Sequence, residues 1–263
     1  MIKLTIDGRE TMAKKGEGRT LLKLAQSLGI KVPTLCYHPS LEPSGGCRLC
    51  LVEITKPSWK GWSKLVVSCA YPAEDGIIVK TNSESVIEAR KFIIELLLFS
   101  CPDSEKIQGL ADEYGIEKNE FTSSGADNRN LMKNCILCGL CVRVCRDIIG
   151  ESVLSFVYRG VNRKVMTPYD ESSDVCLTCG ACAFVCPTGA IKLGDIIPYR
   201  QIEPWHTQRK LKQCASCGRY FIPVILADKL KGKLDLFLEM MDLCLECRRK
   251  KSAESFMVER KET

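Results

Sequence analysis

The chain has 263 residues and a formal net charge of +6; 45% of its residues are hydrophobic and 27% are charged. This composition excludes a disordered chain, and the longest apolar stretch, at 92–99, is too short to span a bilayer, so we expect no membrane insertion. The first residues contain no apolar segment of a signal peptide, which predicts a cytoplasmic protein whose 17 cysteines bind metal rather than form disulfides.

The positive charge does not by itself indicate a nucleic-acid-binding protein. It counts every cysteine as neutral, whereas a metal centre with four thiolates and a core of formal charge +2 contributes about −2. Four such centres would change the net charge from +6 to about −2. We therefore expect no nucleic-acid partner.

The first segment, residues 1–82, is predicted to fold as short strands around one helix. The helix is expected at 20–30, where apolar residues recur at helical spacing between Thr20 as N-cap and Gly29 as the stop. Runs of β-forming residues bounded by Gly and Pro predict strands at 3–7, 51–54, 65–69 and 77–80.

Four cysteines of this segment follow the spacing C-x10-C-x2-C-x18-C: Cys36, Cys47, Cys50 and Cys69. Plant-type ferredoxins carry C-x4-C-x2-C followed by a distant cysteine, so the arrangement is similar but has a longer first interval. In both, a loop would surround the metal and a later strand would bring the last thiolate. Strands around one helix suit the β-grasp shape of such domains, and a ferredoxin-like domain is expected at 1–82.

The second segment, residues 83–128, is predicted to be a helical linker. One helix is expected at 83–100, ended by Cys101 and Pro102, and a second at roughly 104–114. A polar turn cluster around 122–128 indicates the boundary with the next segment. Cys101 is expected to be a buried thiol beside the helix end.

The third segment, residues 129–200, contains the spacing C-x2-C-x2-C-x3-C twice. This spacing is typical of bacterial ferredoxins, in which the fourth cysteine of each run binds the other cluster. It predicts a domain with two [4Fe-4S] clusters, one on Cys135, Cys138, Cys141 and Cys186 and the other on Cys176, Cys179, Cys182 and Cys145. The alternative, a pair of zinc knuckles, expects two CxxC pairs per site rather than triplets.

The residues around these runs support the same interpretation. Gly139 and Gly180 follow the second cysteine of each run, where backbone must pass close to a cluster. The 30 residues between Cys145 and Cys176 favour a ferredoxin domain embedded in something larger. An apolar shell is expected from Val142, Val144, Ala183, Phe184 and Val185.

The last segment, residues 201–263, carries two CxxC pairs separated by 26 residues: Cys214, Cys217, Cys244 and Cys247. Such pairs are typical of a closed structural zinc site, so a small zinc-ribbon-like segment with one Zn²⁺ is expected; four thiolates could instead hold a further iron–sulfur cluster. The residues at 224–241 are expected to be helical. The basic run at 247–251 is expected to be a solvated helix end, and the alternative is that it docks an acidic partner.

The cysteine-containing stretches at 34–54, 135–147 and 176–190, together with Cys69, resemble a known family. They are similar to the N-terminal electron-entry region of the NADH dehydrogenase (complex I) iron–sulfur subunit. The same region occurs in iron-only hydrogenases and in small subunits of NAD-linked hydrogenases. The resemblance covers roughly residues 1–200. It implies that the N-terminal quartet holds a [2Fe-2S] cluster beside the two [4Fe-4S] clusters.

The chain departs from this family between its ferredoxin-like segments. Many members have a further cluster there, ligated by one His and three Cys. The corresponding stretch, 96–116, contains Cys101 as its one cysteine and no histidine. We therefore expect that centre to be absent. His38 is expected to be an ordinary loop histidine rather than a ligand.

The overall expectation is an α+β chain that acts as an electron-transfer subunit of a cytoplasmic NADH-linked oxidoreductase complex, of the hydrogenase or ferredoxin-coupled electron-bifurcating type. The sequence has no GxGxxG, P-loop or flavin motif, so the resemblance implies a flavin- and NAD-binding partner. Electrons would pass to a catalytic subunit, such as a hydrogenase, or to ferredoxin. Alternatives are a free-standing polyferredoxin and, on the C-terminal cysteines and basic residues alone, a zinc-dependent nucleic-acid binder.

Overall fold

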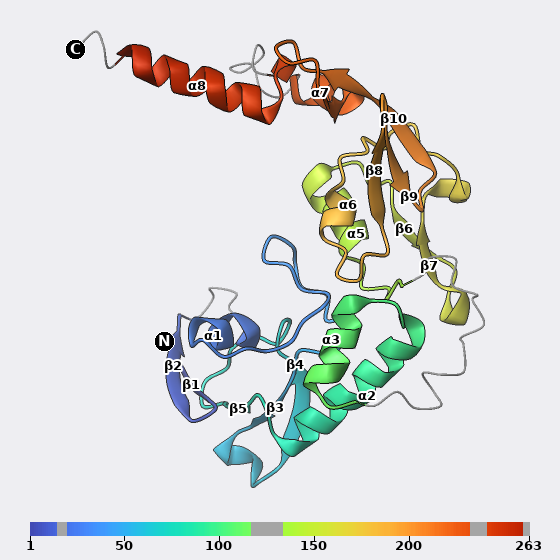
Figure 1. Ribbon diagram of the computed structural model, residues 1–263. Coiled ribbons are helices and arrows are strands. Elements are labelled where there is room, and N and C mark those ends of the chain that lie inside the picture. The colour runs from blue at the N-terminus through green and yellow to red at the C-terminus, as the bar shows by residue number, and fades with distance from the viewer. Residues whose placement is uncertain (15–19, 117–133, 232–240, 260–263) are drawn as a thin grey trace.

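The computed structural model describes residues 1–14, 20–116, 134–231 and 241–259. The chain has the expected α+β architecture, with an N-terminal sheet, a helical pair and a second sheet that leads to the C-terminal helix (Figure 1). Among the described helices, none combines the length and hydropathy needed to cross a membrane.

The N-terminal sheet has five strands in the order β2-β1-β5-β3-β4. β1 and β5 are parallel and the other neighbours are antiparallel. The strands are β1 (Ile2–Ile6), β2 (Arg9–Ala13), β3 (Leu51–Thr55), β4 (Ser63–Val67) and β5 (Ile78–Lys80), with a 3₁₀ turn at Pro57–Trp59. These strands lie close to the predicted runs.

Helix α1 (Leu21–Ser27) packs its apolar side against this sheet. Thr20 caps the helix as expected, because its Oγ1 accepts a 3.4 Å hydrogen bond from Lys23 N. Gly29 follows the helix at φ 72°, where a residue without Cβ is favoured. The core between helix and sheet includes Leu4, Ile6, Leu22, Leu24, Ile54 and Val79.

Two helices follow, α2 (Glu84–Ser100) and α3 (Glu105–Glu113), in the places that the helical periodicity predicts. They form a second core with the loop between α1 and β3. Cys101 lies at the end of α2 and is fully buried, as expected. The expected turn cluster at 122–128 lies outside the described residues.

The two C-x2-C-x2-C-x3-C runs form similar local structures. Each passes through a glycine in the left-handed region, Gly139 at φ 71° or Gly180 at φ 81°, into a short helix, α5 (Leu140–Arg143) or α6 (Ala181–Phe184). A Cβ on Gly180 would lie 2.8 Å from the Leu193 side chain and would have to displace it, and the positive φ at this position is strained for any residue other than glycine. Phe184 is 86% exposed and its side chain points to solvent, so the prediction that Phe184 belongs to the apolar shell is wrong.

The remaining elements of this region are short. A π-helical turn (Val144–Ile149) continues α5, and β6 (Ser155–Val157) pairs with β7 (Lys164–Met166) in a two-stranded ribbon. Single 3₁₀ turns lie at Gly160–Asn162 and Pro168–Asp170.

The second sheet has four antiparallel strands in the order β11-β10-β9-β8. They are β8 (Lys192–Ile196), β9 (Tyr199–Glu203), β10 (Thr207–Gln213) and β11 (Tyr220–Pro223). The expected boundary between residues 200 and 201 therefore falls inside β9, and one sheet joins the third and fourth predicted segments.

Two helices complete the chain. α7 (Val224–Lys231) forms the start of the helix predicted at 224–241, of which 232–240 lie outside the described residues. α8 (Leu245–Glu259) extends away from the second sheet, at the opposite end of the molecule from the N-terminal sheet (Figure 1).

Candidate metal centres

Three cysteines of the N-terminal quartet lie in the loop between α1 and β3, and the fourth, Cys69, follows β4. All four cysteines, Cys36, Cys47, Cys50 and Cys69, are buried. The thiol of Cys47 donates to the Cys36 sulfur and lowers the pKa of Cys36 to about 5. The thiol of Cys69 lowers the pKa of Cys50 to about 7 in the same way. The backbone N–H of Cys47 also donates to Cys36 Sγ, at 3.3 Å. Four adjacent sulfurs of this kind are a donor set suited to iron.

A buried arginine lies beside this quartet and was missed by the sequence analysis. Arg90 of α2 is 1% exposed, and its Nε and Nη2 donate to the carbonyl oxygens of Leu49 and Leu51 at 3.1 and 2.7 Å. Its Nη1 donates to Asn82 Oδ1 and to Tyr114 Oη, each at 3.1 Å. The four acceptors found among the described residues are uncharged. A buried cation needs a compensating negative charge, and thiolates of the neighbouring quartet would supply it.

The sequence did contain a signal for Arg90. The buried residues of α2 recur every fourth position, at Val86, Arg90, Ile94 and Leu98. An arginine in an otherwise apolar row of an amphipathic helix predicts a buried guanidinium with a specific partner.

The first [4Fe-4S] set lines one cavity. Cys135, Cys138, Cys141 and Cys186 face the same space, together with apolar residues and Thr188. The structure thus brings together three cysteines of the first run and the fourth cysteine of the second. Burial raises the pKa of Cys138 to about 11 and raises that of Cys141 as well. Such thiols stay protonated until a metal displaces the proton.

The second set lines a second cavity. Cys145 of the first run and three cysteines of the second run, Cys176, Cys179 and Cys182, face it. Burial raises the pKa of Cys182 to about 12, and the indole N–H of Trp205 opposes that rise. Trp205 belongs to the turn between β9 and β10, outside both cysteine runs, and no spacing rule could have indicated it.

Cys101 lies near the first cavity without lining it. Burial raises its pKa to about 12, and the neighbouring sulfurs of Cys135, Cys186 and Cys138 add to the effect. Among the described residues, the cysteines that line the two cavities do not include Cys101. His38 accepts a 3.2 Å hydrogen bond at Nδ1 from Ser40 N, which is the local role expected for a loop histidine.

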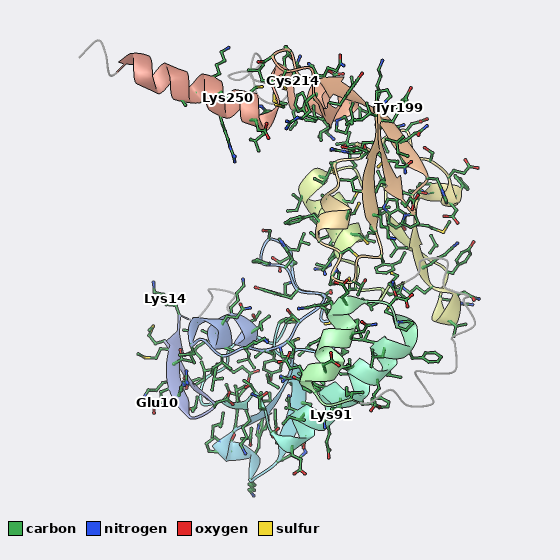
Figure 2. All side chains as sticks on the ribbon, viewed as in Figure 1. Glu10, Lys14, Lys91, Tyr199, Cys214 and Lys250 are labelled. Carbon is green, nitrogen blue, oxygen red and sulfur yellow. The ribbon has the colours of Figure 1, made fainter. Side chains whose placement is uncertain are left out.

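The C-terminal quartet is compact. Ligand atoms of Cys214, Cys217, Cys244 and Cys247 all lie within 4.8 Å of one another. Cys244 N donates to Cys214 Sγ at 3.2 Å, and this backbone N–H is the main reason that the pKa of Cys214 falls to about 6. Figure 2 shows Cys214 close to the start of α8. The set suits one metal ion bound by sulfur.

The basic run at 247–251 lies in the first half of α8 rather than at a helix end. Arg248 Nε donates to Leu243 O at 2.8 Å, so this guanidinium supports the turn that carries Cys244. Lys250 extends from the exposed surface of α8 (Figure 2).

Two family models match the chain. Residues 1–84 match the 2Fe-2S iron-sulfur cluster binding domain, and residues 134–190 match the 4Fe-4S dicluster domain. The chain therefore contains one domain of each kind. Neither match extends to the C-terminal quartet.

Curated relatives share this region. The chain is 34% identical over 217 residues to the NADP-reducing hydrogenase subunit HndD of Solidesulfovibrio fructosivorans, covering 73% of this chain and 36% of the relative. It is 31% identical over 229 residues to the mitochondrial NADH-ubiquinone oxidoreductase 78 kDa subunit of Neurospora crassa, covering 79% of this chain and 29% of the relative. The chain thus spans about a third of the length of these relatives.

A solved structure is also similar. One chain of an NAD+-reducing [NiFe]-hydrogenase in the H2-reduced state matches with a TM-score of 0.59 and 27% sequence identity. The match covers 77% of this chain and 88% of that one. Similarity in sequence and in structure thus points to the same group of proteins.

Proposed function

We propose that the chain is an iron–sulfur subunit of an NADH-linked oxidoreductase or hydrogenase, the kind of protein to which it is similar, and that it relays single electrons between a flavin- and NAD-binding subunit and an electron-accepting subunit. The acceptor would be a catalytic subunit of the hydrogenase kind or a ferredoxin, and the complex would be cytoplasmic. The chain would not be catalytic alone.

The observation that carries this proposal is the succession of cysteine sites along the molecule. Cys36 of the N-terminal quartet and Cys138 of the first cavity contribute to one buried core. Cys141 and Cys182, from the first and second cavities, contribute to another. The quartet therefore neighbours the first cavity, and the first cavity neighbours the second. Such a row of closely spaced sites suits transfer of electrons across the molecule.

This arrangement supports the proposed ligand sets. The N-terminal quartet would hold a [2Fe-2S] cluster, and the two cavities would hold [4Fe-4S] clusters with the fourth cysteine of each run exchanged. Clusters of these kinds accept and release one electron at a time. The protein contributes the thiolates, an apolar surrounding that excludes water, and hydrogen-bond donors near the sulfurs.

The C-terminal quartet would hold one structural Zn²⁺. A tetrahedral site with Zn–S bonds of about 2.3 Å separates its sulfurs by about 3.8 Å. Cys217 Sγ and Cys244 Sγ are 3.7 Å apart, which suits a single ion better than the larger core of a [4Fe-4S] cluster. The site would fix the start of α8 against the β10–β11 hairpin.

NADH oxidation is assigned to a partner because the sequence contains no GxGxxG or P-loop motif. The decisive experiment is anaerobic purification from the native source, with analysis of iron, zinc and flavin. We expect the chain to elute in a larger complex that contains flavin. Elution of the native protein at 29.4 kDa without flavin would contradict the proposal and favour a free-standing polyferredoxin.

A further inference from the structure

The second cavity contains two buried hydrogen-bond donors without a well-formed hydrogen bond. Trp205 Nε1 and Thr178 Oγ1 are both buried, and neither makes a hydrogen bond of normal geometry to a described residue, although the indole N–H is close enough to the Cys182 sulfur to lower the pKa of that thiol. Both residues line this cavity, and their side chains are 2% and 1% exposed. Leaving such groups without an acceptor in a protein interior costs free energy. The cavity must therefore receive an acceptor when it is filled.

The surrounding hydrogen bonds fix Trp205 in this place. Thr207 Oγ1 donates to Trp205 O at 2.8 Å and accepts from Ser173 N at 3.3 Å. Arg209 then donates from Nη2 to Ser173 O at 2.7 Å and from Nε to Cys176 O at 3.2 Å. The β9–β10 turn is thereby bound to the loop that carries the second cysteine run.

Charges near the second cavity do not oppose this arrangement. Glu151 also lines the cavity, but its carboxylate forms an ion pair with Lys229 of α7. The guanidinium of Arg209 adds a positive charge beside Cys176. The fourth predicted segment thus supplies an indole and a guanidinium to this side of the second cavity, and its Lys229 offsets the negative charge of Glu151.

The first cavity is different. Apart from its cysteines, its one polar lining side chain among the described residues is Thr188. The hydroxyl of Thr188 already contacts Cys186 Sγ at 3.7 Å. No indole or guanidinium lines this cavity within the described part of the chain. Hydrogen bonds to sulfur stabilise the reduced, more negative form of an iron–sulfur cluster. The two cavities therefore differ in one of the features that set reduction potential, because the second has two such donors and the first has one.

We propose that Trp205 and Thr178 donate hydrogen bonds to sulfur atoms in the second cavity and make it the more easily reduced of the two [4Fe-4S] sites. This inference rests on the proposed ligand sets. Electrons on the chain would then gather at the site next to the second sheet, which is where an acceptor would have to dock. The turn between β9 and β10, beyond the matched dicluster domain, would act as a positioning element for this site.

The test uses the full chain with its clusters, studied by redox titration followed by electron paramagnetic resonance. Trp205→Phe keeps an aromatic ring but removes the N–H, and Thr178→Val removes the hydroxyl from a side chain of similar shape. Each should lower the equilibrium constant for reduction of the second site about tenfold, or about 59 mV for one electron, and leave the first site unchanged. Thr178→Ser, which keeps the hydroxyl, should retain the original potential.

Two matched controls separate this effect from general damage. Trp62→Phe changes an exposed indole on the N-terminal domain and should shift neither site. Thr188→Val changes the first cavity and should shift that site alone. Equal shifts of both [4Fe-4S] sites in Trp205→Phe, or no shift in either donor variant, would overturn the inference.

A measurement on the unmodified protein tests the inference even if the variants do not fold. Chain labelled with ¹⁵N in the tryptophan indole should show a ¹⁵N coupling to the reduced second site in pulsed electron paramagnetic resonance. Absence of this coupling would refute the role of Trp205. If the unmodified chain instead shows no pair of [4Fe-4S] signals, the proposed function itself has failed, so the two failures are distinguishable.

Discussion

Arg143 Nη2 donates a 2.9 Å hydrogen bond to the carbonyl oxygen of Cys36, 107 positions earlier in the chain. Its Nη1 also donates to Glu42 O. Arg143 lies between two cysteines of the first run, so one side chain joins the loop of the N-terminal quartet to the loop of the first cavity. Leu41, from the same N-terminal loop, is buried in the core beside Leu140.

The first prediction concerns this junction between the two loops. Arg143→Met should remove both hydrogen bonds, release the loop at 36–43 from the first cavity and lower the free energy of unfolding by about 2 kcal/mol. Hydrogen exchange of that loop should rise, and chemical denaturation should show the loss. Arg146→Met is the matched control, because Arg146 is exposed and pairs with its neighbour Asp147. Equal behaviour of the two variants would show that the junction does not hold the loop.

The junction also shows what sequence patterns can and cannot predict. Cysteine spacing predicted the sets that the structure brings together, because ligand spacing within a short loop is a local property. The contacts of Arg143, Arg90 and Trp205 join segments that are distant in sequence, and no local pattern specifies which distant segment a side chain will meet. The course of β9 across residue 200 was missed for a similar reason: strand pairing is decided by neighbouring strands.

The second prediction concerns Arg90. Arg90→Met should leave the carbonyl oxygens of Leu49 and Leu51 without donors and remove the cation beside the N-terminal quartet. We expect the free energy of unfolding to fall by about 3 kcal/mol and the [2Fe-2S] site to become harder to reduce. Lys91→Met changes the next residue of α2, which is exposed (Figure 2), and should alter neither property. An unchanged potential in Arg90→Met would mean that the guanidinium serves packing alone.

The third prediction concerns metal content. Anaerobically purified chain should contain about ten iron atoms and about one zinc, from one [2Fe-2S] site, two [4Fe-4S] sites and the C-terminal quartet. Cys217→Ser should lower zinc while iron stays the same, as measured by elemental analysis. Cys101→Ser is the control and should retain both metals, because Cys101 lines neither cavity. About fourteen iron atoms without zinc would assign the C-terminal quartet to a further iron–sulfur cluster.

The last prediction concerns the exchange of the fourth cysteine between the runs. Cys186 follows Cys182 by four positions, yet it lines the first cavity, whereas Cys182 lines the second. Ala181 and Cys182, in the first half of α6, line the second cavity, whereas Cys186 follows the end of α6 and lines the first. Cys186→Ala should therefore damage the [4Fe-4S] site of the first run.

Electron paramagnetic resonance of the reduced chain can measure each site separately. In Cys186→Ala, the signal of the site on Cys135, Cys138 and Cys141 should be lost or altered, while the other [4Fe-4S] signal persists. Cys182→Ala should have the opposite effect, although both substitutions fall in the same run. If Cys186→Ala instead removes the site on Cys176, Cys179 and Cys182, each run binds its own cluster. The cavities seen here would then not be the cluster sites, because the cavity that Cys186 lines contains no other cysteine of its run.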